Sequence, residues 1–273
     1  MKSHPFLEFA INYPSVIVAL IGMVACLIRS VRNPQDGRRN DFLMLGLALA
    51  LPANALAEMI AQSVSILRPY KYDLYIYRLD GIFGFQPSFV IGRLVAEHAS
   101  LTILVSVSYS ILPMVMAGVL AAHLWGRPRT QELGHMVRAF VLNLMAALPI
   151  YCLIPVCGPQ FAFPDFPWSS PPVAAHPIPL SAAPNGIPSV HFSTALLITW
   201  YLRHWTWGKW CGGAYLALTA LATLGSGQHY VFDLIVAIPY AYAVCSVTRS
   251  RVRASSALTA PSEAEMKQVA RAD

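Results

Sequence analysis

The sequence predicts an all-α integral membrane protein with about seven transmembrane helices, and three observations support this fold class. Hydrophobic residues make up 56% of the 273-residue chain and charged residues only 12%, whereas a soluble domain carries about 25% charged residues. The mean hydropathy is +0.52. Apolar runs of about 20 residues, the length that crosses a bilayer, recur at 12–29, 41–65, 99–124, 138–156, 189–205, 211–227 and 230–248.

The seven runs divide the chain into three parts. Residues 1–40 contain an extra N-terminal helix and an arginine-rich loop, and residues 41–248 contain the six helices of the main membrane domain. The fifth and sixth runs are short, so they tilt little or are shielded by neighbouring helices. Residues 249–273 are rich in Ser, Ala and charged residues, which is typical of a disordered cytoplasmic tail.

Positive charges orient the spans, because loops on the cytoplasmic side carry an excess of Lys and Arg. Most of these residues fall on one side if the spans alternate, namely Arg29, Arg32, Arg38, Arg39, Arg127, Arg129, Arg138, Arg203, Lys209, Arg249, Arg251 and Arg253. This distribution predicts an N-terminus outside and a C-terminus inside, and it accounts for the formal net charge of +6. No basic and aromatic patch indicates a nucleic-acid partner.

Two loops lie on the predicted outer side. Aromatic and charged residues interleave within 66–98, as in a segment that lies on the membrane surface. The loop 157–187 contains eight prolines together with four large aromatic residues. This aromatic content favours a packed cover over a site near the membrane, and the alternative is a flexible linker.

His229 and Asp233 are four residues apart at the outer end of the seventh span. On a helix this spacing places both side chains on one face. A carboxylate holds the imidazole in one tautomer, so the pair can act as a nucleophile or a base. The alternative from the pair alone is a histidine that hydrogen-bonds a helix-capping aspartate.

A second histidine lies on the same side of the membrane. Pro188 and Ser189 are good helix starters, and His191 follows them at the start of the fifth span. Free amides at a helix N-terminus attract anions, phosphate above all. The sequence therefore places an anion-binding helix start, a histidine and a His–Asp pair at one membrane depth.

These residues carry a resemblance to the type 2 phosphatidic acid phosphatase superfamily. Pro188-Ser189-Val190-His191 resembles its Pro-Ser-x-His motif, and His229-Tyr230-Val231-Phe232-Asp233 resembles its His-x-x-x-Asp motif. The His-Tyr-x-x-Asp form and the run Tyr151–Pro159 are similar to the inositol phosphorylceramide synthase-like branch. The resemblance implies a six-helix catalytic core over 41–248, with the first span as an addition.

The resemblance also implies metal-independent phosphoryl transfer through a His-His-Asp triad. His229 would attack the phosphorus of a lipid phosphate or phospho-headgroup, Asp233 would orient it, and His191 would protonate the leaving oxygen. A phosphohistidine intermediate would then pass its phosphoryl group to water or to an alcohol. Ser189 and the amides of the same helix start are candidates for binding the phosphate oxygens.

The chain departs from the family pattern at its cations. Ala222-Thr223 stands where the usual Ser-Arg pair precedes the second motif, and the Lys-x6-Arg-Pro motif is missing before the fifth span. Arg78 and Arg93 flank the predicted surface segment and are the best candidates to neutralise phosphate charge. The alternative for each is an anchor to lipid headgroups.

We therefore expect a membrane lipid phosphatase or phosphotransferase that uses no cofactor and no metal, in the plasma (inner) membrane, with an extracytoplasmic site. Its partners would be the bilayer, a phospholipid or polyprenyl phosphate substrate, and a lipid alcohol acceptor if it transfers. One alternative is a transporter that uses the His–Asp pair as a proton relay, although such proteins place their site at mid-membrane. Another is a haem protein with His191 and His229 as axial ligands.

Overall fold

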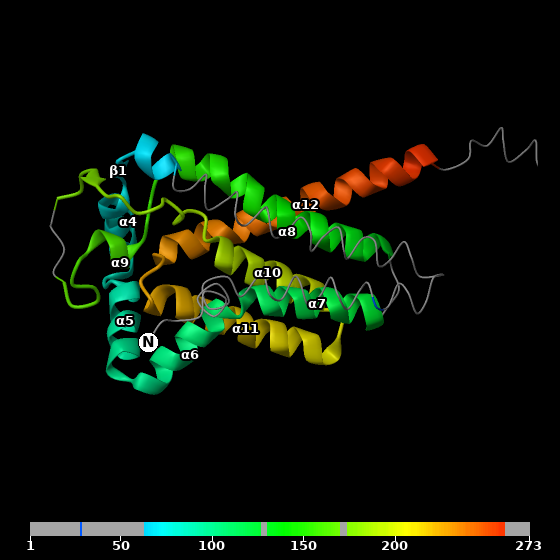
Figure 1. Ribbon diagram of the computed structural model, residues 1–273, viewed down its shortest axis with the longest axis horizontal. Coiled ribbons are helices and arrows are strands. Elements are labelled where there is room, and N and C mark those ends of the chain that lie inside the picture. The colour runs from blue at the N-terminus through cyan, green and yellow to red at the C-terminus, as the bar shows by residue number, and fades with distance from the viewer. Residues whose placement is uncertain (1–27, 29–62, 127–129, 170–173, 260–273) are drawn as a thin grey trace, which may run out of the picture.

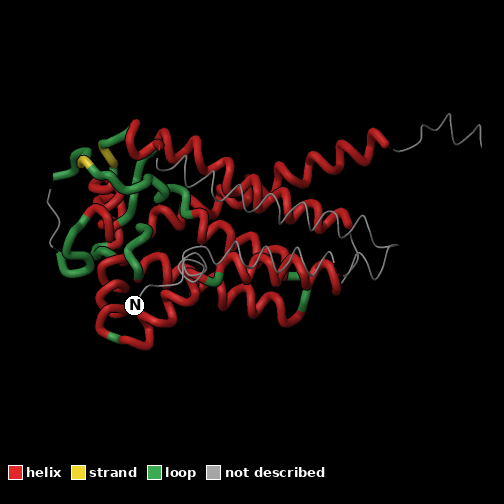
Figure 2. Tube along the Cα trace, in the orientation of Figure 1, coloured by secondary structure: helices red, strands yellow, loops and turns green. Residues whose placement is uncertain are grey.

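The computed structural model describes residues 28, 63–126, 130–169 and 174–259, and they are mainly helical (Figures 1 and 2). A two-residue antiparallel pair joins β1 (Tyr70–Lys71) to β2 (Ile178–Pro179). The helices in chain order are α4 (Asp73–Asp80), η2 (Gly81–Phe83), α5 (Pro87–Glu97), α6 (Ala99–Ser110), α7 (Leu112–Gly126), α8 (Thr130–Leu153), α9 (Pro159–Ala162), α10 (Val190–Leu202), α11 (Thr206–Gly225) and α12 (Val231–Thr259).

The long helices form a bundle that is closed at one end by a smaller head (Figure 1). α7, α8, α10, α11 and α12 run along the long axis, whereas α4, α5, α9 and the β1–β2 pair gather at one end. We call the segment from β1 to the end of α5, together with the described part of 157–187, the head. α5 and α6 meet at His98 with a bend of 116°, so α5 lies across the end of the bundle.

Apolar side chains fill the bundle between α7, α8, α10 and α12. Met136, Ile198 and Val244 belong to one buried cluster there, which is the arrangement expected when apolar helices pack side by side. α10 contacts α11 and α12 along its length, and it is therefore the helix that brings residues near 190 to residues near 230.

Two helices in the described part of the chain are long and apolar enough to cross a membrane, Glu132–Leu153 and Val231–Arg249, and the bent pair α5 and α6 makes a third if it counts as one span. The seven predicted spans are thus not confirmed. Nearly all of the first and second runs lie outside the described residues. The third run, 99–124, forms the consecutive helices α6 and α7, with Pro113, which lacks an N–H donor, beside their junction.

Two of the predicted segments differ from the structure in their extent or type. Residues 66–98, predicted as a loop lying on the membrane surface, contain α4, η2 and α5. The glycines and proline between them are strong local breakers and hide short helices from a search for long periodic runs. α12 continues to Thr259, past the predicted boundary at 248. Residues 249–259 contain no Gly or Pro, so no strong helix breaker ends the helix at 248.

The proline-rich loop packs onto α5 within the head. Phe163 and Phe166 lie against Phe89 of α5, with ring centroids 5.3 and 5.1 Å apart. The ring of Phe166 also fills the space beside Gly92 and Gly227, where an added Cβ would come within 2.7 and 2.6 Å of it. The loop therefore covers the turn that leads into His229.

Candidate active site

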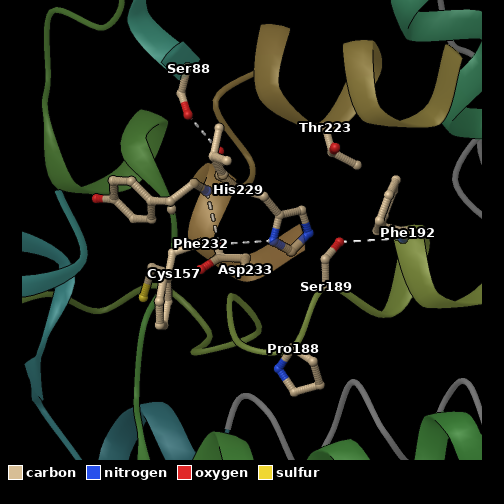
Figure 3. A network of polar contacts seen from close by, with 12 residues as sticks. Ser88, Cys157, Pro188, Ser189, Phe192, Thr223, His229, Phe232 and Asp233 are labelled. Carbon is tan, nitrogen blue, oxygen red and sulfur yellow. Dashed lines mark hydrogen bonds and ion pairs between the residues drawn. The ribbon is translucent and has the colours of Figure 1, made fainter. Parts of the chain in front are cut away.

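His229 and Asp233 are in direct contact at the head end of the bundle (Figure 3). Nδ1 of His229 lies 3.2 Å from Oδ2 of Asp233, and both side chains are buried. α12 begins at Val231, so His229 lies on the turn before the helix and Asp233 lies in its first turn. An ionised Asp233 accepts from Nδ1–H, which leaves Nε2 with its lone pair free for chemistry.

The backbone on both sides of His229 is fixed by hydrogen bonds. The amides of Gln228 and His229 donate to the carbonyl of Thr223 over 3.1 and 3.2 Å. The carbonyl of His229 accepts from the Ser88 hydroxyl over 3.1 Å. Burial lowers the pKa of His229 to about 4, although a backbone hydrogen bond at Gly186 raises it in part. The imidazole is therefore neutral at pH 7, as a nitrogen nucleophile must be.

Ser189 joins the start of α10 to the start of α12. Its hydroxyl accepts from the amide of Phe192 over 3.3 Å, which makes it the N-cap of α10. Its amide lies 3.4 Å from the carbonyl of Asp233. Figure 3 shows its hydroxyl pointing toward the imidazole of His229. The N-terminus of α10, with its positive dipole end, therefore faces the histidine.

His191 lies in the first turn of α10, two residues after Ser189. Its ring stacks on that of Tyr109 from α6, with centroids 4.0 Å apart and planes inclined by 19°. It is close enough to His229 for the two imidazoles to influence each other electrostatically. The structure thus brings together four of the predicted site residues, His229, Asp233, His191 and Ser189.

The two arginines predicted to bind phosphate lie apart from these four residues. Arg78 is exposed on α4 and Arg93 is exposed on α5. Nε of Arg93 donates to the carbonyl of Pro167 over 3.1 Å, and its guanidinium lies 5.8 Å from the ring centroid of Trp168. Arg93 therefore holds the covering loop, and neither arginine contacts the four clustered residues within the described part of the chain.

Three polar residues that bound the site were not predicted from the sequence, namely Asp73 and Asp80 of α4 and Ser88 of α5. All three are buried and bond to the segment 229–232. Burial, with Asp233 nearby, raises the pKa of both α4 carboxyls to about 6, although backbone hydrogen bonds oppose the shift. The one available signal was the spacing of Asp73 and Asp80, which puts both on one helical face.

The described residues include no group of three or more His, Cys, Asp or Glu side chains arranged to hold a metal ion. The cysteines at 152, 157, 211 and 245 are free thiols. The titratable groups at this end of the bundle include the imidazoles of His191 and His229 and the carboxyls of Asp73, Asp80 and Asp233.

Comparison with known proteins gives one match. A family model described as PAP2 superfamily matches residues 74–247. No curated protein and no solved structure matches the chain. The matched region starts within α4 and ends within α12, so it includes all of the titratable residues named above except Asp73.

Proposed function

This chain belongs to the PAP2 superfamily, whose members are phosphatases or phosphotransferases that act on phosphorylated lipids, and on that premise we propose that it transfers a phosphoryl group from a lipid phosphate or phospho-headgroup through His229. The observation that carries the proposal is the buried contact of 3.2 Å between Nδ1 of His229 and Asp233. It directs the neutral Nε2 toward the start of α10, where amides with a positive dipole end favour an anion.

In the first step Nε2 of His229 attacks phosphorus and the bond from phosphorus to the leaving oxygen breaks. His191 enters this step as an imidazolium and donates a proton to that oxygen, so the leaving group departs as a neutral alcohol and His191 is left neutral. The imidazole of His229 becomes cationic on phosphorylation, and the carboxylate of Asp233 stabilises that charge. Ser189 and the amides of the α10 N-terminus bind the phosphate oxygens.

In the second step an acceptor O–H attacks the phosphohistidine. His191 takes the acceptor's proton, the bond from phosphorus to Nε2 breaks, and His229 returns to its neutral form. Water as acceptor gives hydrolysis, and a lipid alcohol gives transfer. We propose transfer, as in the inositol phosphorylceramide synthase-like branch, because Tyr230 provides the His-Tyr-x-x-Asp form of the motif.

We further propose that the site faces the extracytoplasmic side. Arg203 and Lys209 lie at the end of α10 and the start of α11, away from the head in Figure 1, and Arg249 lies in the later part of α12. Cationic residues gather on the cytoplasmic side of membrane proteins. The head, and the nearby ends of α10 and α12 with His191 and His229, lie at the opposite end of these helices.

The test is turnover of a panel of lipid phosphates, including phosphatidic acid and a polyprenyl phosphate, by the detergent-solubilised protein with and without lipid alcohols. We expect His229→Ala and Asp233→Asn to remove turnover, and His191→Ala to lower it by about 10²–10⁴-fold, the usual contribution of a general acid. His204→Ala, at an exposed histidine near the other end of the bundle, is the matched control. Undiminished turnover by His229→Ala would overturn the proposal.

Two inhibitors add independent tests of the chemistry. Vanadate mimics pentavalent phosphorus, so we expect it to inhibit and a metal chelator to have no effect. Inhibition by the chelator would show that a metal takes part in the reaction.

A further inference from the structure

α4 presents two buried carboxylates on one face. Asp73 is its first residue and Asp80 its last, and their side chains are 0% and 1% exposed. A separation of seven residues is two helical turns, so both point the same way. The opposite face, which includes Tyr75 and Leu79, is exposed. α4 therefore directs its two negative charges inward, toward the start of α12.

Asp80 satisfies the amides that begin α12. Its Oδ2 accepts from the amide of Val231 over 2.8 Å and its Oδ1 from that of Phe232 over 2.9 Å. The first amides of a helix have no hydrogen-bond partner within the helix. The residue that immediately precedes the helix usually caps them with its side chain. Here the cap comes from a residue 151 positions away, while the backbone amide of Tyr230 donates to Oδ2 of Asp233.

Asp73 binds Tyr230, the residue before α12, and the loop segment at Cys157 and Gly158. Its carboxylate accepts from the Tyr230 hydroxyl over 3.2 Å and from the amides of Cys157 and Gly158 over 3.1 and 2.8 Å. Tyr230 is completely buried, so this hydroxyl has no access to water. A buried donor that loses its partner is costly, and the tyrosine ring is thereby fixed.

We propose, resting on the proposed function, that Asp80 and Asp73 are positioning residues that fix Tyr230, Val231 and Phe232 and so hold His229 against Asp233. These three residues are the whole link between the two members of the pair. A rotation of the first turn of α12 would carry Asp233 away from Nδ1 of His229. Hydrogen bonds from amides to an ionised carboxylate are stronger than neutral ones, which explains why aspartates serve here.

The experiment is a titration of the purified full-length protein in detergent with vanadate, which reports the geometry of the site without a lipid substrate. The variants are Asp80→Ala, which removes the cap, and Asp80→Asn, whose side-chain oxygen still accepts from an amide. Glu97→Ala removes an exposed carboxylate from α5 of the same head and is the matched control. His229→Ala is the reference for loss of the nucleophile, and thermal unfolding is measured for each protein.

We expect Asp80→Ala to raise the vanadate dissociation constant by about tenfold or more, since small displacements of a reacting group have large effects. Asp80→Asn should stay within about threefold of the unchanged protein because it keeps a cap, and Glu97→Ala should match that protein. Normal binding by folded Asp80→Ala, with binding lost in His229→Ala, would refute the positioning role alone. Vanadate binding that is absent from the unchanged protein or intact in His229→Ala would refute the proposed function itself.

Discussion

Replacing Gly158 by alanine should disturb the site through one backbone contact. Gly158 has φ +113°, a conformation that side chains other than glycine's rarely adopt, and an added Cβ would lie 2.1 Å from the carbonyl oxygen of Gln228. Ordinary contact begins at 3.4 Å, so the two segments must separate by about 1.3 Å, the difference between these two distances. Gln228 immediately precedes His229, so the displacement reaches the proposed nucleophile directly.

Two costs follow from this geometry. The positive φ and the overpacking together should destabilise the fold by about 2–5 kcal/mol. A displacement of about 1 Å at a reacting group can lower the rate by about 10²-fold. The bond from the Gly158 amide to Asp73, at 2.8 Å, would be strained by the same movement.

The assay compares Gly158→Ala with Gly213→Ala in detergent. Gly213 lies on α11 with nothing within 4 Å of an added Cβ, so alanine there should be neutral or stabilising by up to about 1 kcal/mol. Thermal unfolding measures stability, and turnover of a lipid phosphate measures the rate. Equal unfolding temperatures and rates in the two variants would refute the argument from close approach.

Three further predictions concern the same end of the molecule. The pKa of Asp73 is about 6, above its unfolded value of about 3.9, so the folded state binds this proton more tightly and stability falls as pH rises from about 4 to 6. Asp73→Asn should flatten that part of the curve of unfolding temperature against pH, and a parallel curve would contradict this. Lys71→Met leaves the carbonyl of Leu180 without the donor that lies 3.0 Å from it, and it should lower the free energy of unfolding by about 1–3 kcal/mol. Denaturant unfolding measures this change, and an unchanged midpoint would count against the hydrogen bond. Tyr109→Phe keeps the ring stacked on His191 and should retain turnover, whereas Tyr109→Leu should lose several-fold because an aromatic pair contributes about 1 kcal/mol; equal losses would assign the effect to the hydroxyl.

Local patterns in the sequence identified the clustered side chains. The spacing of His229 and Asp233, and the helix starters before His191, are signals within a few residues. The family match supports a phosphatase or phosphotransferase, while the catalytic roles of these residues stay predictions. Such signals need no knowledge of the tertiary structure, because the groups that act together are neighbours along the chain.

The residues that hold the clustered side chains in place could not be predicted in the same way. Asp73 and Asp80 stand among tyrosines, leucines and Arg78 in a segment that resembles a loop on the membrane surface. Their spacing puts them on one helical face, but nothing local marks that face as buried. Their partners at the start of α12 are the hydroxyl of Tyr230 and the amides of 231 and 232, which lie 151–157 residues away. Every residue except proline has a backbone amide, so the sequence of α12 does not indicate that its first amides are capped by a distant residue.

The long-range hydrogen bonds of α4 also govern when the site can form during synthesis. Ribosomes deliver α4 long before α12, and the chain between them comprises most of the bundle. Until residues 230–232 emerge, Asp80 lacks its amide partners, and a carboxylate without partners favours water over a protein interior. The contacts that join α4 to the start of α12 therefore form only after residues 230–232 have been made, so the head and this end of the bundle assemble late in synthesis.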